Sequence, residues 1–124
     1  MKTFDLNILV GTKENIFSII ELSGYLDAHT VNMFENRLSE ILETGEMNVV
    51  LDLQGLNYIS SAGIGALMTL TQQIRKKQGD LVLLRPNKKV YKILDLLGFT
   101  KIFNVALDEN EIKEFFQSKK QEKK

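Results

Sequence analysis

The sequence predicts a single α/β domain with a mixed sheet of four to five strands and about four helices packed on it. Three observations lead to this prediction. Apolar residues alternate with other residues near the start of the chain, which is the period of a half-buried strand. Further along, apolar residues recur every three or four positions, as they do on one face of a helix. Dense apolar segments follow the helical patterns, and buried parallel strands have this composition.

The first two elements are expected to form an antiparallel pair. Apolar residues occupy alternate positions of Phe4–Val10, and Gly11–Asn15 follows with the composition of a hairpin turn. Ile16–Leu22 is a second, isoleucine-rich strand. Because only a short connection joins the two segments, they should lie side by side in opposite directions.

A helix and a central strand are expected next. Gly24–Asp27 leads into the helix, where Asp27 is a cap or an anchor, and Gly45 ends it. Asn48–Leu53 is a dense apolar strand, and its position after a helix predicts a parallel, central place in the sheet. The apolar face of the helix comprises Val31, Phe34, Leu38, Ile41 and Leu42.

The second half of the chain alternates helices and strands. A long helix starts in Ser60–Gly65, and Leu81–Leu84 is the next buried strand. Pro86–Asn87 starts a third helix, and Asp108–Glu111 has the composition of a capping box for a last one, with room for a short strand before it. We place the domain in residues 1–117 and a polar, lysine-rich tail in residues 118–124. The apolar stripe of the third helix comprises Val90, Ile93, Leu94 and Leu97.

Composition argues against several classes of function. The 124 residues include no cysteine and one histidine, which excludes disulfides and a Cys nucleophile and makes a His-based metal cluster or a Ser-His-Asp triad unexpected. No apolar stretch approaches the ~20 residues of a membrane span, and Asp5 comes too early for a secretory signal. We therefore expect a cytoplasmic domain without cofactor or metal, and without membrane contact.

The formal net charge is zero, which gives no chain-wide basic field for direct binding of nucleic acid. Residues 1–72 nevertheless hold 3 basic and 9 acidic side chains, whereas residues 73–124 hold 13 basic and 7 acidic ones. Such a split either orients a partner or reflects exposed helix faces that differ in charge, and we favour the second interpretation. A solvated face is expected for Arg75, Lys76, Lys77, Arg85, Lys88, Lys89 and Lys92.

Small polar residues and glycines meet in Ser60–Gly65, between the central strand and the long helix. Open α/β sheets meet ligands and partners at this edge. On spacing alone, helix capping by Ser60 or Ser61 and close packing by the glycines explain the segment. Gly63–Gly65 lacks the third glycine of a dinucleotide loop, and the sequence has no phosphate loop and no G-x-S-x-G elbow.

Phosphorylation is a third interpretation of the same segment. A phosphoserine adds about −1.5 to −2 charges at pH 7, and a helix N-terminus tolerates that charge. The modification would therefore change a partner surface without unfolding the domain.

Several segments in the right order resemble the STAS domain of bacterial anti-sigma factor antagonists, from about position 4 to position 116. Gly24–Asp27 is similar to the family's G-x-L-D element, and Phe103 to its downstream aromatic residue. The other matching segments are Val49–Leu53, Asn57–Gly65, Leu81–Leu84 and Val90–Phe99. The resemblance implies a STAS-like fold and a protein-binding module, not an enzyme.

The resemblance also implies partners and a switch. The unphosphorylated domain would bind an anti-sigma factor that is also a serine kinase of the histidine-kinase-like ATPase type, and so release a sigma factor. Phosphorylation would end the interaction, and a metal-dependent serine phosphatase would restore it. The family's acceptor serine maps to Ser61, and Ser60 stands where many members carry aspartate. The implied partner surface comprises Asp27, Tyr58, Ile59, Ser60, Ser61, Ala62, Gly63 and Ile64.

Alternatives remain open. STAS domains also serve partner-switching circuits without a sigma factor, lipid transport and nucleotide binding, and nothing in the residues separates these roles. A small enzyme would need a base, a metal site or a phosphate loop, and none is evident. Asp27 either anchors its loop or lies near Ser61. Asp52 either is buried and hydrogen-bonded, which we favour, or points toward the Ser61 loop.

Overall fold

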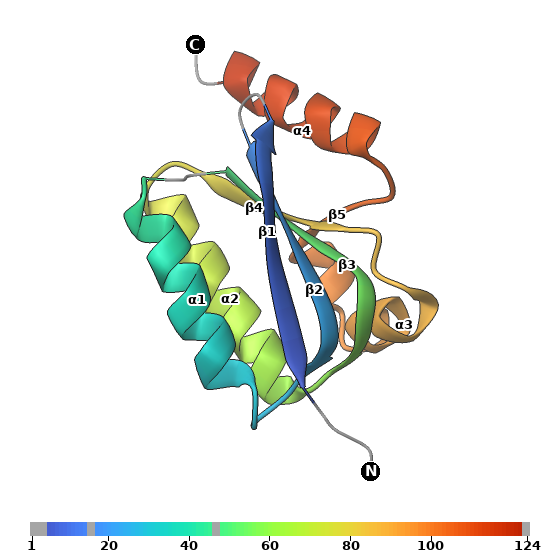
Figure 1. Cartoon of the computed structure of the whole chain (residues 1–124). Helices are drawn as coiled ribbons and strands as arrows, with labels where there is room; N and C mark the ends of the chain where they lie inside the picture. Colours follow the sequence, from blue (N-terminus) through green and yellow to red (C-terminus); the bar gives the residue numbers. More distant parts are fainter. Residues whose placement is uncertain (1–4, 15–16, 46–47, 123–124) are drawn as a thin grey trace.

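The computed structural model describes residues 5–14, 17–45 and 48–122 and confirms the predicted α/β class (Figure 1). Within these residues a mixed sheet of five strands has the order β1-β2-β3-β4-β5. The strands are β1 (Leu6–Glu14), β2 (Phe17–Leu26), β3 (Asn48–Ile59), β4 (Asp80–Leu84) and β5 (Asn104–Ala106). The helices are α1 (Val31–Glu43), α2 (Ser61–Lys76), α3 (Lys88–Leu96) and α4 (Glu109–Glu122), with the short 3-10 helix η1 (Phe99–Lys101) before β5.

The strand directions bring two helix starts to one edge of the sheet. β1 and β2 are antiparallel, as predicted, and β2, β3, β4 and β5 are parallel to one another. A helix crosses over between each parallel pair, so neighbours in sequence are neighbours in the sheet. At the carboxyl ends of β2 and β3, Tyr25 pairs with Tyr58 and Leu26 with Ile59. The segments that lead into α1 and α2 therefore lie next to each other.

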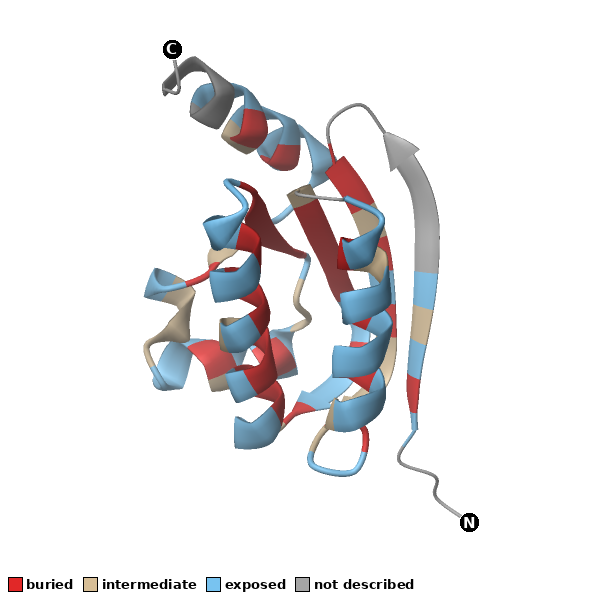
Figure 2. Ribbon diagram, turned by 90° about the vertical axis from the view of Figure 1, so that its left-hand side faces the viewer, coloured by how far each residue is buried: buried red, intermediate tan, exposed pale blue. Residues whose placement is uncertain are grey.

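The two faces of the sheet carry separate apolar cores. α1 and α2 lie side by side over one face, and their buried residues point toward the strands (Figure 2). α4 covers part of the other face, where the ring of Phe116 stacks on Phe17 with 5.6 Å between the ring centroids. In β4, Leu81 and Leu83 belong to the first core and their neighbours Val82 and Leu84 to the second. Burial on both faces is why Leu81–Leu84 is apolar throughout.

Several predicted boundaries were wrong. β1 continues through Gly11–Glu14, where we expected a turn, because the β1–β2 register shifts between Val10 and Lys13 and the glycine lies in this irregularity. Asn15 lies outside the described residues. β2 and β3 are longer than predicted, since their pairing continues after the apolar alternation in the sequence has stopped.

One prediction for α3 also differs from the structure, and the extent of α4 bears on another. Leu97 was placed on the buried stripe of α3, but it is 58% exposed because α3 ends at Leu96 and the helical spacing stops there. α4 continues to Glu122, so the predicted start of the tail at residue 118 falls inside this helix. The division into a domain and a tail remains a prediction.

Gly24 allows β1 to pass close to β2. Its φ is +99°, and a Cβ atom at this position would lie 2.1 Å from the carbonyl oxygen of Asp5. The next amide, Tyr25 N, donates a hydrogen bond to that oxygen at 2.9 Å. Only glycine meets both requirements without strain, which explains the first residue of the Gly24–Asp27 element.

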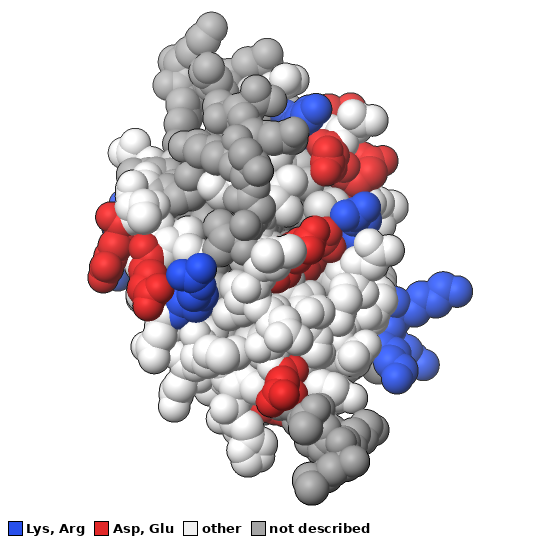
Figure 3. Space-filling view, viewed as in Figure 1, with Lys and Arg blue, Asp and Glu red and all other residues white. Residues whose placement is uncertain are grey.

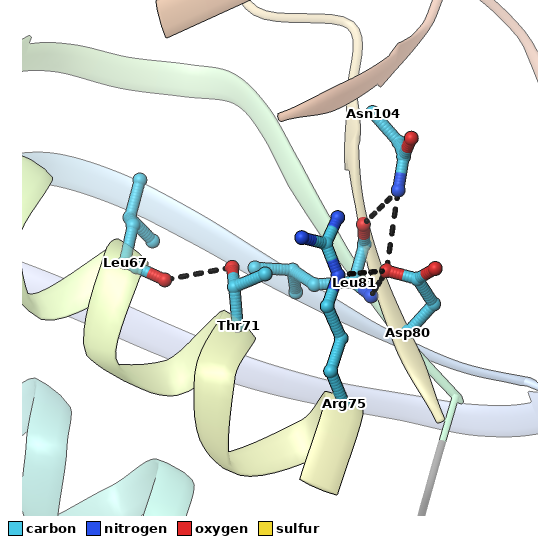
Figure 4. A network of polar contacts seen from close by, with 6 residues as sticks. All are labelled: Leu67, Thr71, Arg75, Asp80, Leu81 and Asn104. Carbon is cyan, nitrogen blue, oxygen red and sulfur yellow. Dashed lines mark hydrogen bonds and ion pairs between the residues drawn. The ribbon is translucent and has the colours of Figure 1, made fainter. Parts of the chain in front are cut away.

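A polar network fixes the C-terminal end of α2 to β4 and β5 (Figure 4). The buried Oδ1 of Asp80 accepts from Leu81 N at 2.9 Å, from Asn104 Nδ2 at 3.2 Å and from Arg75 Nε at 3.3 Å. The Asn104 amide also donates to the Leu81 carbonyl at 3.2 Å. At 1.5 Å per residue, this end of α2 lies about 21 Å along the helix from Ser61.

Candidate functional site

The predicted site residues meet at the carboxyl ends of β2 and β3. β3 ends at Ile59, Ser60 caps α2, and Ser61 is the first residue of that helix. The loop after β2 is held against this junction because Ser60 N donates a hydrogen bond to Leu26 O at 2.9 Å. We use the name Ser61 corner for Asp27 together with residues 58–64.

The two neighbouring serines have different roles in the structure. Ser60 is half-buried in an extended conformation, and its Oγ accepts a hydrogen bond from Gly63 N at 3.2 Å, which makes it the N-cap of α2. Ser61 is exposed, and its hydroxyl has no hydrogen-bond partner among the described residues. The capping role that the sequence left open between the two therefore belongs to Ser60, and the free hydroxyl belongs to Ser61.

Gly63 seats the first turn of α2 against the strand ends. A Cβ atom on Gly63 would lie 2.7 Å from Leu26 O and 2.9 Å from side-chain carbons of Leu26 and Ile59. A Cβ atom on Gly65 would meet nothing within 4 Å. The predicted close packing by glycine therefore holds for Gly63 and not for Gly65.

Asp27 anchors the loop that follows β2, one residue after Leu26, which pairs with Ile59. Its Oδ1 accepts from His29 N at 2.9 Å and from Thr30 N at 3.2 Å. The buried Thr30 completes the loop, since its Oγ1 donates to Tyr25 O at 2.7 Å and accepts from Asp27 N at 3.0 Å. Sequence reasoning missed Thr30, although an Asp followed three residues later by Thr before a helix is a detectable turn signal.

Burial divides the residues implied as a partner surface. Ser61, Ala62 and Tyr58 are exposed, the last at 43%. Asp27 and Ser60 are half-buried. Three residues of that surface are buried and hold the corner in place, while their part in partner binding stays a prediction: Ile59, Gly63 and Ile64.

A groove of about 670 Å³ opens beside the Ser61 corner. One wall comes from the ends of β2 and β3 and the other from α3. Asn87 fixes the α3 wall, since its Nδ2 donates to the backbone oxygens of Leu56 and Gln54 while its Oδ1 caps Val90 N at 3.0 Å. The lining residues, most of which sequence reasoning had not linked to the site, are Tyr25, Asp27, Asn57, Tyr58, Lys89, Lys92, Ile93 and Leu96.

Asp52 has the structural role that we favoured. It is buried in β3, where its Oδ2 pairs with Arg85 Nη2 at 2.7 Å and its Oδ1 accepts from Gln54 N at 3.1 Å. The hydrogen bond to Asp52 and its negative charge raise the pKa of the Arg85 guanidinium. The ion pair fastens the end of β4 to β3 and leaves Asp52 no contact with Ser61.

The Ser61 corner offers an exposed hydroxyl above the first turn of a helix, where backbone N–H groups favour a negative charge. Within the described residues, no three acidic or histidine side chains are grouped as metal ligands would be. The same part of the chain contains no helix with the length and apolar character of a membrane span. The arrangement leaves the Ser61 hydroxyl accessible at the start of a helix.

Comparison with known proteins places the chain in a family. The family model of the STAS domain matches residues 7–112, and the chain belongs to this family. Its relatives include the Bordetella bronchiseptica protein BtrV, whose name assigns it to the anti-sigma factor antagonists and which is 38% identical over 85 residues, 68% of this chain and 73% of BtrV. The anti-sigma F factor antagonist of Paenibacillus polymyxa is 31% identical over 88 residues, 70% of this chain and 75% of that protein.

Solved structures agree on the fold. The anti-sigma factor antagonist SpoIIAA in its unphosphorylated form matches with a TM-score of 0.73 and 20% identity, over 90% of this chain and 97% of that one. The phosphorylated form of the Bacillus SpoIIAA matches with a TM-score of 0.65 and 20% identity, over 88% and 99% of the two chains. This confirms the predicted STAS-like fold, a mixed sheet with helices packed on it.

Proposed function

We propose that the chain is an anti-sigma factor antagonist whose binding is switched by phosphorylation of Ser61. In its unphosphorylated form it binds an anti-sigma factor and thereby frees a sigma factor. The names of the relatives support the class of function. The single observation that supports the switch is the exposed, unbonded hydroxyl of Ser61 next to the half-buried, capping hydroxyl of Ser60.

A phosphate at Ser61 would leave the fold intact and change the surface. It would stand at the N-terminus of α2, where the helix dipole favours negative charge by about 0.3–1 kcal/mol. A partner that covers Ser61 would have to bury about −1.5 to −2 charges at pH 7 without having built a counter-charge for them. Affinity should therefore fall while stability holds. SpoIIAA, which shares the fold, has been solved with and without its phosphate.

The switch needs enzymes from outside the chain. In the proposed circuit the anti-sigma factor is itself the ATP-dependent serine kinase, and a metal-dependent serine phosphatase removes the phosphate. The chain contributes an accessible acceptor on a rigid support: Ser60 is bonded to Leu26 O and Gly63 N, so the backbone that presents Ser61 is fixed on both sides.

The proposal is tested by affinity capture from the native lysate, with wild type, Ser61→Asp and Ser60→Asp as baits. Aspartate at position 60 keeps a capping oxygen and adds the same charge one residue away, so it is the matched control. We expect a kinase-type ATPase on the wild-type and Ser60→Asp baits and its loss from Ser61→Asp. Mass spectrometry after incubation with that ATPase and ATP should place the phosphate on Ser61. Equal capture by all three baits would refute the switch.

A further inference from the structure

We infer that the groove between α3 and the ends of β2 and β3 is a second part of the partner-binding surface, and that it takes an acidic segment of the anti-sigma factor carrying an apolar side chain. The identity of the partner rests on the proposed function. The groove itself, with its lining of tyrosines, lysines and leucine, is a property of this chain.

One face of α3 lines the groove and carries two lysines and an exposed leucine. Lys89, Lys92 and Leu96 recur at helical spacing and line the groove, whereas Val90 and Leu94 on the opposite side of the helix are buried in the core. Leu96 is 76% exposed, which is high for a leucine on a helix packed at the domain surface. Tyr58 contributes a second exposed apolar surface from the β3 wall. An apolar side chain placed between Leu96 and Tyr58 would remove both from water.

The charge of the groove is positive. Neither Lys89 nor Lys92 forms an ion pair with any of the described side chains. The one carboxylate in the lining, Asp27, already accepts hydrogen bonds from the amides of His29 and Thr30. In Figure 3 blue side chains project on the side where α3 lies in Figure 1, bordered by uncharged surface. Acidic residues of a partner would complement this wall.

The groove is continuous with the Ser61 corner. Asp27 and Tyr58 belong to both, and Asn87 holds α3 at a fixed distance from β3 through the carbonyls of Gln54 and Leu56. A partner that covers Ser61 therefore reaches the groove without any rearrangement of the chain. This continuity favours a segment of the same partner over a small molecule or a second copy of the chain.

The test measures the affinity of the purified anti-sigma factor for four forms of the full chain by calorimetry. The forms are wild type, the Lys89→Glu/Lys92→Glu double variant, Leu96→Ala, and a matched Lys76→Glu/Lys77→Glu control at the far end of α2. We expect the groove charge reversal to weaken binding at least tenfold and Leu96→Ala several-fold, with the control within twofold of wild type. Added NaCl should weaken wild-type binding more than that of the groove double variant.

A photo-crosslinker at position 96 identifies the occupant. We expect it to link to a segment of the anti-sigma factor with acidic residues beside an apolar one. Ser61-dependent binding with full affinity in the groove double variant would overturn the groove inference and leave the proposed function standing. Crosslinking between two copies of the chain would also overturn it, as would a small molecule that native mass spectrometry detects on the purified wild type and not on the groove double variant. A wild-type chain that binds no anti-sigma factor would overturn both proposals.

Discussion

Gly63 and Gly65 lie two residues apart in α2 and should respond in opposite ways to the same change, alanine. In a helix, alanine is favoured over glycine by about 0.5–1 kcal/mol, because the unfolded glycine has more conformational freedom to lose. A Cβ at Gly65 meets nothing within 4 Å, so Gly65→Ala should raise the free energy of unfolding by this full amount.

At Gly63 the same methyl group collides with the end of β2. It would lie 2.7 Å from Leu26 O, a backbone atom that moves only with its strand. Overpacking of this kind costs about 1–3 kcal/mol. Moving α2 outward would also stretch the hydrogen bond from Ser60 N to Leu26 O, worth about 1 kcal/mol. These two costs are partly offset by the preference of a helix for alanine over glycine. Gly63→Ala should therefore lower the free energy of unfolding by about 1–3 kcal/mol.

Urea denaturation followed by circular dichroism measures both variants against wild type. The two free energies of unfolding should differ by about 1.5–4 kcal/mol, with Gly65→Ala above wild type and Gly63→Ala below it. If both variants were stabilised equally, α2 would not be seated on Leu26 as described, and the geometry that presents Ser61 would be wrong.

Three further predictions concern the polar contacts. Ser60→Ala removes the cap of α2 and should lower the free energy of unfolding by about 0.5–2 kcal/mol, whereas Ser61→Ala should stay within about 0.5 kcal/mol of wild type; equal losses in urea titrations would contradict the assignment of the cap. Asn87→Asp keeps the cap on Val90 N but sets a carboxylate against the Leu56 carbonyl, which should lower the free energy of unfolding by about 1–3 kcal/mol. An unchanged melting temperature would refute the role of Asn87 in holding α3 against β3. Asp80→Ala leaves the Leu81 amide without its acceptor and should lower the free energy of unfolding by about 1–3 kcal/mol. Its affinity for the anti-sigma factor should stay at the wild-type value, because the Asp80 network lies at the opposite end of α2 from Ser61. Weaker binding by the folded variant in calorimetry would contradict this.

The order of elements could be predicted because each periodicity has a direct physical cause. Leu81–Leu84 is apolar throughout since it is buried from both faces, and the spacing of Phe34, Leu38 and Leu42 puts them on one side of α1. The lengths of β2 and β3 could not be predicted, because backbone pairing continues them past the apolar alternation. The strand at Gly11–Glu14 could not be predicted, since glycine in a strand irregularity and glycine in a turn have the same local sequence pattern.

The position of the candidate site could be predicted from the sequence, but the roles of its two serines and the groove beside it could not. Ser60–Gly65 follows a strand and starts a helix, where open α/β sheets meet ligands and partners, but spacing alone favoured helix capping and close packing. The family resemblance, and not the spacing, pointed to Ser61. Which serine caps the helix depends on the direction of one hydroxyl, which the backbone angles at Ser60 decide. The position of α3 beside the groove depends on hydrogen bonds from Asn87 to carbonyls more than thirty positions earlier in the chain. A contact between residues so far apart cannot be predicted from a local sequence pattern.

The most direct test of the central claim compares the affinity of the purified anti-sigma factor for the chain before and after stoichiometric phosphorylation. Burying an uncompensated charge at an interface costs about 2–5 kcal/mol, so phosphorylation of Ser61 should weaken binding at least about 30-fold, with an unchanged or slightly raised melting temperature. Equal affinity for both forms, or a phosphate found on Ser60, would contradict the account.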